Sequence, residues 1–588
     1  MSTNLKLLIN SMKLKKLDAL LVPRADMYSG EEVPEDEERL KYITNFSGSA
    51  GYAIISANSD VKSVLFSDGR YELQLKKEVD PKYFDCLIGG FKDTCLFLKK
   101  NEKKIKNIGI DPWLLTLKQY ELLKSLLKGS KIKFELVDKN LIDEIWIEKN
   151  FIVKNKIFEI SNQINGEPAS SKFNRLKKII KKNNCDFYIL FNPAGLSWLL
   201  NIRGTDLKYS PVIRSFCVIS KTGEVFIFTK NHMLKKYFCK NKEIKIYNLD
   251  DFSNLLLNLK NKKFLIDPNF LPLKIYHILK ENYLPYQFIN CPVDKFKAIK
   301  NPLELSGFKN AHLKDGLAIL KFLFWFEKNV NSNKLTEICL SQKLFDIRSL
   351  DKTFICESFA TISAFEENGA IIHYKASNSS NKKIDKSSLY LIDTGAHYLD
   401  GTTDITRTLL VGKAKSQMLD DYTLVLKGHI AIASASFPVG TKGRELDTLG
   451  RVALWSEGKD YAHGTGHGVG HVLSVHEGPI SISKTSECYI ESGMVISNEP
   501  GYYKKGVYGI RIENLEFVKE KANKNFLCFE NLTRVPLELN LINKRMLSSF
   551  EINWINNYHK KVYQDLSKLI DKDDKELLLF LKRKTTTI

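Results

Sequence analysis

The sequence lacks membrane-spanning segments and paired cysteines. No run reaches the roughly 18 consecutive apolar residues that a membrane helix needs. The ten cysteines never occur as Cys-x-x-Cys. Most cysteines stand beside apolar residues, so we expect reduced, buried thiols in a cytoplasmic protein. Lysines interrupt the apolar positions of the first twenty residues, and no secretory signal is expected there.

The excess of positive charge is not gathered in one place. Lysine and arginine number 89 against 68 acidic residues, a formal net charge of +21. Such a charge would suit a polyanionic partner, yet the lysines are dispersed with asparagine along the whole chain. Dispersed charge is typical of a solvated surface. We therefore expect no nucleic-acid partner and no membrane association.

The first half contains a diverged internal duplication. The strand-like run at residues 18–23 is echoed at 186–191, and Ile-Asp-Pro at 110–112 is echoed at 266–268. Both echoes are separated by similar lengths of chain, which predicts two related α/β modules of about 150 residues. Alternating β-type runs between the echoes indicate mixed sheets flanked by helices.

With 588 residues, the chain is too long for one hydrophobic core. We place three domains at residues 1–155, 156–296 and 297–588. The third opens with Asn301-Pro302 and an apolar-periodic stretch from 303 to 326, which predicts a long helix. Leucines alternate with charges over residues 564–582, which predicts a packed terminal amphipathic helix.

Four acidic residues stand at the ends of apolar, strand-like runs in the third domain. Two lie between the runs 389–392 and 405–409, and two adjoin the runs 494–496 and 510–512. Taken singly, each fits a turn cap or a surface charge. Buried together, they would need a cation or donor, because an unpaired buried carboxylate is costly. Two divalent cations require bridging carboxylates, so a two-metal hydrolase site is predicted from Asp393, Asp404, His467, Glu499 and Glu513.

The geometry of the first acidic pair depends on the turn between its strands. If residues 396–401 form a wide loop, Asp393 falls opposite Asp404. A tight turn at 400–401 would leave both carboxylates on one face but roughly 13 Å apart, so we expect the wide loop. In the second pair of strands, Arg511 shares a face with the last acid of the set, where it can steady carboxylates or an anionic intermediate.

Three histidines recur at every fourth position in the segment 463–471, with four glycines between them. A helix, as in zinc proteases, is unfavourable because each glycine costs about 1 kcal/mol. In an extended or looped backbone, His463, His467 and His471 can point the same way. A dinucleotide-binding loop is not supported, since Val469 stands where the third glycine is needed. His373 and His476 fit core histidines when considered alone.

The combined motifs resemble a known family. They are GAIIHY (369–374), DGTTDITRT (400–408), HGTGHGVGH (463–471), NEPG (498–501) and GIRIEN (509–514), with FSGSAG (46–51), SDGRY (67–71), LLNIRG (199–204) and KAIKN (297–301) in the earlier part. The chain resembles the Xaa-Pro aminopeptidases, also called aminopeptidase P, of the three-domain eukaryotic cytosolic kind. The likeness implies two creatinase-like α/β domains followed by a pita-bread metallopeptidase domain.

The resemblance also implies a dinuclear metal site. Asp393 would hold one ion, Asp404 and Glu513 would bridge, and His467 and Glu499 would complete the other. Manganese is the usual activating metal, and carboxylates with one imidazole suit a hard ion; zinc and cobalt are left open. A bridging hydroxide would attack the carbonyl before proline.

Substrate contacts follow from the same resemblance. Glu499 would accept the proton of the attacking water, and His463 and His476 would polarise the carbonyl or stabilise the oxyanion. His373 would position the peptide or assist proton transfer. Tyr503 and Arg511 would orient the substrate. A homodimer is also implied.

Two alternatives remain open. One is a related hydrolase, either a prolidase restricted to dipeptides or a methionine aminopeptidase, although the long N-terminal half disfavours the latter. The other is a non-catalytic pita-bread protein that binds peptides or histones. Such relatives typically lose metal ligands, and all five are present here.

Overall fold

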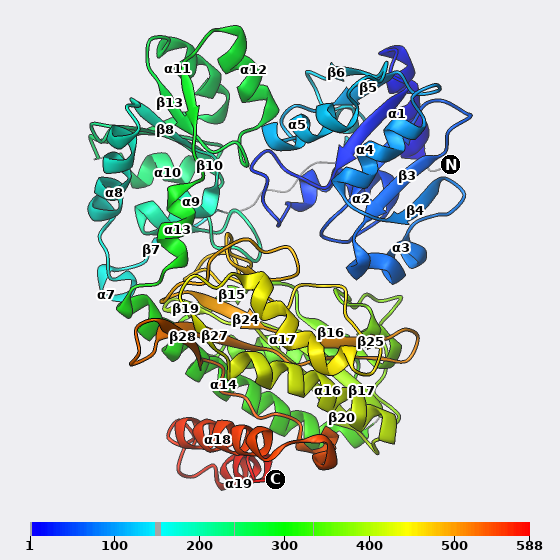
Figure 1. Ribbon diagram of the computed structural model, residues 1–588, viewed down its shortest axis with the longest axis vertical. Helices are drawn as coiled ribbons and strands as arrows, with labels where there is room; N and C mark the ends of the chain where they lie inside the picture. Colours follow the sequence, from blue (N-terminus) through cyan, green and yellow to red (C-terminus); the bar gives the residue numbers. More distant parts are fainter. Residues whose placement is uncertain (1–2, 148–154, 240, 333) are drawn as a thin grey trace. The chain divides into compact units, whose positions relative to one another are not determined.

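The computed structural model describes residues 3–147, 155–239, 241–332 and 334–588. The chain forms two compact units: residues 1–159 with 167–293, and residues 160–166 with 294–588. Figure 1 follows the chain from the blue N-terminus to the red C-terminal helices. The finer division of the first unit at residue 155 stays a prediction.

The first unit contains two six-stranded mixed sheets with the same topology. One has the order β4-β3-β2-β1-β5-β6 and consists of β1 (Ala19–Pro23), β2 (Tyr52–Ser56), β3 (Ser63–Ser67), β4 (Phe84–Ile88), β5 (Asn107–Ile110) and β6 (Lys133–Leu136). The other has the order β12-β11-β10-β8-β13-β14 and consists of β8 (Phe187–Leu190), β10 (Ser215–Ser220), β11 (Val225–Thr229), β12 (Ile244–Asn248), β13 (Phe264–Ile266) and β14 (Tyr286–Phe288). The parallel and antiparallel pairings also correspond strand by strand. The predicted duplication is therefore confirmed.

Helices of corresponding position accompany the two sheets. Around the first are α1 (Thr3–Leu14), α2 (Arg39–Thr44), α3 (Glu72–Glu78), α4 (Phe91–Lys100), α5 (Leu117–Leu126) and α6 (Leu141–Ile145). Around the second are α8 (Ala169–Lys182), α9 (Pro193–Leu200), α10 (His232–Tyr237), α11 (Phe252–Asn258) and α12 (Leu273–Glu281). The modules join through equivalent segments: Thr116 forms an antiparallel bridge with Pro272, flanked by backbone hydrogen bonds between 115–117 and 271–273. The two modules thus contact each other through the same segment, the one that precedes α5 in the first and α12 in the second.

The second unit is built around α14 (Pro302–Asn329), the long helix predicted from the sequence. Asn301 caps it with its side chain, and Glu304 bonds back to the Asn301 backbone, which satisfies otherwise orphaned N–H groups. The other helices are α13 (Pro292–Ala298), which begins just before this unit, α15 (Glu337–Arg348), α16 (Ser416–Ala433), α17 (Gly443–Trp455), α18 (Ser549–Leu566) and α19 (Lys575–Lys584). Its largest apolar core joins α14 and α16 to the central strands and the terminal helices.

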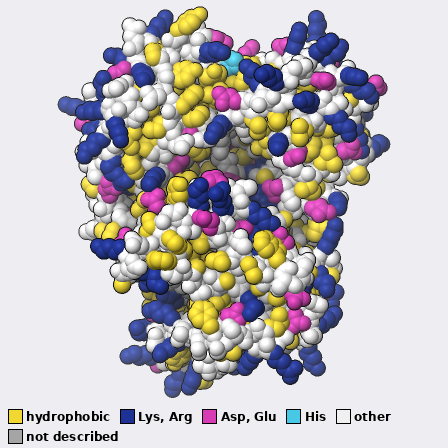
Figure 2. Space-filling view, in the orientation of Figure 1, with side chains coloured by type: hydrophobic (Ala, Val, Ile, Leu, Met, Phe, Trp, Pro, Cys, Tyr) yellow, Lys and Arg dark blue, Asp and Glu magenta, His cyan; other side chains and the backbone are white. Residues whose placement is uncertain are grey.

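Two sequence expectations need correction here. The terminal segment is two helices rather than one, because α18 ends at Leu566 and Asp574 caps a new helix. All ten cysteines are free thiols, but only Cys95, Cys185, Cys217 and Cys291 are buried; the others are partly or fully exposed. No helix in the described part of the chain is long and apolar enough to span a membrane. On the face seen in Figure 2, lysines and arginines are scattered among acidic and apolar side chains.

Candidate metal centre

The first acidic pair lies in an interrupted hairpin. β17 (Ser388–Thr394) pairs with β20 (Ile405–Val411), and beyond a break β18 (Ala396–Tyr398) pairs with β19 (Gly401–Thr402). Tyr398 pairs with Gly401, so the turn consists of residues 399–400 alone. Asp393 faces Thr406, not Asp404. The predicted wide loop is therefore wrong.

The correct register still brings the two carboxylates together. Because side chains alternate along a strand, Asp404 and Thr406 share a face, and Asp404 becomes the diagonal neighbour of Asp393. Diagonal neighbours lie about 7–8 Å apart, within reach of a shared cation. The observed turn, at residues 399–400, lies one residue before the tight turn at 400–401 considered from the sequence. This shift reduces the offset between Asp404 and the residue that faces Asp393 from four residues to two.

The second acidic pair lies in a similar hairpin. β24 (Val495–Asn498) pairs with β27 (Asn514–Glu520), and β25 (Gly501–Lys504) pairs with β26 (Tyr508–Arg511) in the same register. Glu499 and Glu513 fall at the break, directly opposite each other. Like charges in this position repel, so the arrangement favours a bound cation between them. The predicted pairing of these two acids is confirmed.

The histidine-rich segment is extended, as predicted, rather than helical. Its short strand β22 (Gly466–His467) pairs with β23 (Ser481–Ile482). A Cβ on Gly466 would lie 2.0 Å from the Ser497 carbonyl oxygen, which explains the glycine before the histidine. His467 Nδ1 lies 3.0 Å from the Gly468 carbonyl. When Nδ1–H donates there, Nε2 is left as the ligand atom.

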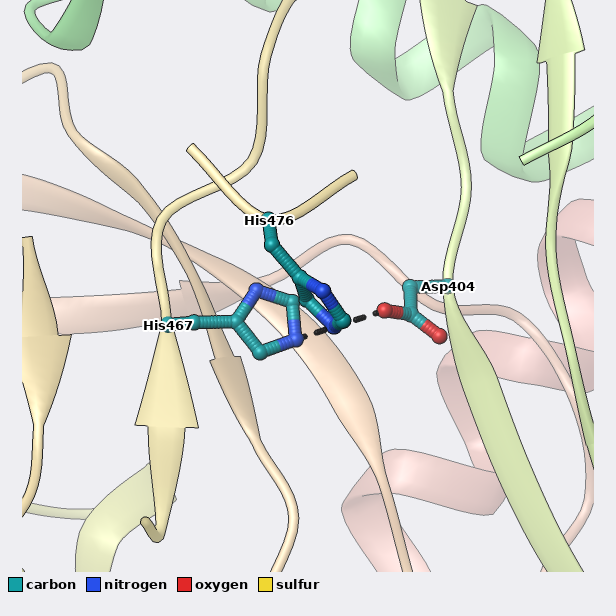
Figure 3. Close-up of side chains that lie close together, drawn as sticks. All are labelled: Asp404, His467 and His476. Atoms are coloured by element: carbon teal, nitrogen blue, oxygen red, sulfur yellow. Dashed lines mark ion pairs between the residues drawn. The ribbon is translucent and has the colours of Figure 1, made fainter. Parts of the chain in front are cut away.

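The five residues predicted as ligands converge. Donor atoms of Asp393, Asp404 and Glu513 lie within 4.8 Å of one another, as do those of His467, Glu499 and Glu513. His467 Nε2 lies 3.5 Å from oxygens of both Asp404 and Glu499. A third group joins Asp404, His467 and His476; the two rings converge beside the carboxylate at the start of β20 (Figure 3).

This donor set fits two divalent cations. Oδ1 of Asp393 is buried without a hydrogen-bond partner, and such an atom is costly unless a cation meets it. Burial raises the pKa of Asp393 to about 6, and the charges of Asp404 and Glu499 act in the same direction. The positive charge of Arg511 only partly offsets this increase. Burial and neighbouring carboxylates also raise the pKa of Glu499 and of Glu513. Bound cations would remove this repulsion.

His467 shows the opposite electrostatic response. Burial alone would lower the pKa of His467, but its hydrogen bond to Asp404 and the charges of Glu499 and Asp404 raise it to about 9. Without metal, the imidazole therefore holds a proton that a metal would displace.

A chain of polar groups adjoins the acids. Arg511 donates to Asp393 Oδ2 at 2.5 Å and to the Tyr503 hydroxyl at 2.5 Å. The Tyr503 hydroxyl lies 2.8 Å from Nε2 of His463. A longer contact of 3.4 Å joins Arg511 to the carbonyl of Ile372, next to His373. Arg511, Tyr503 and His463, three of the side chains expected to bind substrate, thus form a connected chain next to Asp393.

His471 departs from the predicted arrangement. Its Nε2 lies 2.9 Å from the Asp400 carbonyl, and its ring packs on Phe308 of α14. The backbone beyond His467 is not a regular strand, and Val472 has a positive φ of 52°. The prediction that His463, His467 and His471 point the same way is therefore wrong.

Sequence reasoning missed the residues that hold these side chains. Thr406 donates from its hydroxyl to Glu513 at 2.7 Å and accepts from Arg511 Nε at 3.2 Å. On α17, Arg451 donates to the His463 carbonyl at 2.7 Å. Thr406 could have been found from its position, two residues after Asp404 on the same face.

Comparison with known proteins decides the family. Residues 306–520 match Metallopeptidase family M24, residues 525–588 match the C-terminal region of peptidase_M24, and residues 5–144 and 149–304 each match a Creatinase/Prolidase N-terminal domain. Xaa-Pro aminopeptidase 1 of Dictyostelium discoideum is 36% identical over 96% of this chain and 93% of its own length. The chain belongs to the Xaa-Pro aminopeptidases of metallopeptidase family M24. It is a hydrolase with creatinase-type N-terminal domains and a pita-bread catalytic domain.

Solved structures agree with this family assignment. The crystal structure of X-prolyl aminopeptidase from Caenorhabditis elegans, described as a cytosolic enzyme with a di-nuclear active site, matches with a TM-score of 0.92 and 33% identity over 100% of this chain and 99% of that one. Xaa-Pro dipeptidase from Bacillus anthracis matches 63% of this chain and 99% of its own, with a TM-score of 0.51 and 25% identity. The full-length likeness is therefore to the aminopeptidase.

Proposed function

We propose that this aminopeptidase removes the first residue of peptides whose second residue is proline. The convergence of Asp393, Asp404, His467, Glu499 and Glu513 carries the proposal. The names of full-length relatives support the choice of substrate.

We propose the five converging residues as ligands of two divalent cations, most simply Mn²⁺ because the donors are hard. Zn²⁺ and Co²⁺ remain alternatives. When bound, such cations would supply a bridging hydroxide near neutral pH and polarise the scissile carbonyl. Four carboxylates match the charge of two divalent ions, which supports the stoichiometry.

The surrounding side chains divide the remaining work. Glu499 is the proposed proton acceptor, because burial raises its carboxylate pKa and makes it a stronger base. Tyr503 can donate to His463 while accepting from Arg511, so His463 serves to orient Tyr503. His476 is exposed over the His467 ring, where it can donate to a developing oxyanion. His373 follows Ile372, whose carbonyl Arg511 contacts, and its proposed role is to contact the peptide.

Selectivity for proline must come from shape. An Xaa-Pro amide has no N–H for the enzyme to grip, so discrimination depends on the pocket for the ring and on contacts to the carbonyl and amino terminus.

The peptide pair Arg-Pro-Pro and Arg-Ala-Ala tests the proposal. Purified protein loaded with Mn²⁺ should release arginine from the first and not from the second. Equal cleavage of both would refute proline selectivity, and cleavage of neither would refute the activity. Cleavage of Arg-Pro but not Arg-Pro-Pro would instead favour a prolidase-like dipeptidase.

We further propose a cytoplasmic homodimer. The C. elegans relative is described as cytosolic. One face of α17 exposes Leu449, Val452 and Trp455 by 37, 54 and 44%, and apolar residues spaced three apart form one stripe on a helix. A second copy is the proposed cover for this stripe.

A further inference from the structure

Glu477 is a buried carboxylate directly beside an exposed histidine of the proposed site. His476 is exposed, whereas Glu477 is 3% exposed. The carboxylate is therefore directed into the interior of the protein, on the other side of the backbone from the solvent that His476 reaches. Its charge therefore needs partners in the interior.

Two buried lysines provide those partners. Lys300 Nζ lies 2.6 Å from Glu477 Oε1, and Lys297 Nζ lies 3.2 Å from Oε2. Lys297 also donates to the carbonyl of Gly478 at 3.3 Å. Both lysines are 3% exposed. Burial would raise the pKa of Glu477, but the two ammonium groups hold it below its usual value.

The backbone next to these lysines is hydrogen-bonded to the hairpin that carries Glu499 and Glu513. The backbone N–H of Lys300 donates to the Gly493 carbonyl at 2.9 Å, and Ile299 bridges Met494. Residues 493–494 lead directly into β24, which ends next to Glu499. The ion cluster therefore connects the His476 segment to the strand that carries a proposed ligand.

Glu477 also contacts the histidine-rich segment. Its backbone N–H donates to the Gly468 carbonyl at 2.8 Å, one residue after His467. A Cβ on Gly468 would lie 2.3 Å from the Glu477 carbonyl oxygen, and one on Gly470 would lie 2.9 Å from Glu477 Oε2. These glycines leave the space that Glu477 occupies.

The result is a short connection between two histidines. His467 is bonded to Gly468, which is hydrogen-bonded to Glu477, which is bonded to His476. The centroids of the two imidazole rings lie 4.3 Å apart and the ring planes are inclined at 86°. Figure 3 shows the two rings close together.

We propose that Glu477, held between Lys297 and Lys300, is a positioning residue that fixes His476 over His467 for the reaction. An ion cluster at this place is not explained by stability alone, since buried ion pairs can often be replaced by apolar groups without loss. The inference rests on the proposed role of His476.

A double-mutant cycle between Glu477→Gln and His476→Ala tests the inference, with kcat and KM for Arg-Pro-Pro. In the wild-type background, Glu477→Gln should lower kcat about 10- to 100-fold, as for other residues that orient a site. In the His476→Ala background it should cost less than about 3-fold, because interacting residues are non-additive. Equal losses in both backgrounds would overturn the inference.

Two further measurements keep a structural role separate. Bound metal and melting temperature are recorded for every variant. Asp421→Asn is the matched control: Asp421 is fully buried, 2.7 Å from Lys459 Nζ, and should lose stability but not kcat. If Glu477→Gln does not fold, Lys297→Met in the same cycle decides, since it leaves the shorter Lys300 contact intact.

Crystal structures of the wild type and Glu477→Gln provide a readout besides activity. The His476 ring should leave the His467 ring in the variant; an unmoved ring would overturn the inference. Failure of the wild type to cleave Arg-Pro-Pro would instead refute the proposed function, and unchanged kcat in His476→Ala would refute the role of His476.

Discussion

At the scale of single residues, the site is a set of acids whose charges conflict in the absence of metal. One arginine cannot neutralise the negative charge of two opposed glutamates and a diagonal pair of aspartates. The raised pKa values of Asp393, Glu499 and Glu513 and the unpartnered Oδ1 of Asp393 express the same conflict. Removing a proposed ligand should therefore affect metal binding before it affects the fold.

Asp404→Ala and Glu513→Ala should each lower kcat/KM at least about a hundredfold, because each removes a proposed bridging ligand. The unfolding temperature of the metal-free proteins should stay close to that of the metal-free wild type or rise, since one repelling charge is gone. Peptide assays and thermal unfolding check this. A variant that keeps most activity would exclude that residue from the site.

Thr406→Val should weaken metal binding about 10- to 100-fold, as expected for a residue that orients a ligand. The hydroxyl lost is the one that donates to Glu513. Titration with Mn²⁺ measures the change. Thr423→Val is the control, because its buried hydroxyl bonds the Leu419 carbonyl within α16 and the Asn543 N–H; an equal effect there would contradict the assignment.

Metal removal should destabilise the protein more at pH 7.5 than at pH 5. In the metal-free fold the Asp393 pKa is raised to about 6, above its unfolded value of about 3.9. The folded state then holds the proton more tightly, so stability is present at low pH and is lost as pH rises through 6. Melting with and without chelator should show a gap that widens with pH; a constant gap would count against buried, charge-strained ligands.

At the scale of elements, strand identity and shared faces could be predicted, but register could not. The sequence offered Asp400-Gly401 as the natural turn because glycine favours tight turns. In the structure Gly401 instead allows close packing against α14. A Cβ at this position would lie 3.0 Å from the Ala311 Cβ and 3.1 Å from the Phe308 Cα. Only the position of α14, a tertiary fact, distinguishes these two uses of glycine.

Gly307→Ala should destabilise the protein, by about 1–3 kcal/mol as for overpacking. Glycine to alanine inside a helix normally stabilises by roughly 0.5–1 kcal/mol, but here a Cβ would lie 2.1 Å from the Asp400 carbonyl oxygen. Urea unfolding measures the sign. Gly90→Ala is the control, since nothing lies within 4 Å of its Cβ position; a stabilised Gly307→Ala would mean that the turn can move freely.

At the scale of the whole molecule, composition and the two echoes predicted the repeated N-terminal architecture. The matching strand orders confirm the duplication. What the sequence could not supply were the buried polar connections, such as Lys300 with Glu477, since the partners are 177 positions apart. Such contacts depend on tertiary packing that local pattern does not record.

Trp455→Glu should convert the proposed dimer to a monomer, because a charge would enter an apolar contact. Light scattering after size-exclusion chromatography measures the mass against 67.4 kDa for one chain. Tyr283→Glu, 91% exposed in the first unit, is the control and should stay dimeric. A wild-type monomer, or an unchanged dimer in Trp455→Glu, would contradict the proposed interface.

The bridge between Thr116 and Pro272 has a consequence for ancestry. It joins the same position of two homologous modules, as an isologous contact joins two identical subunits. A free-standing single module with this edge could meet a second copy of itself in the same way. Tandem fusion of the genes would then have converted an association between molecules into a fold contact that no longer depends on concentration.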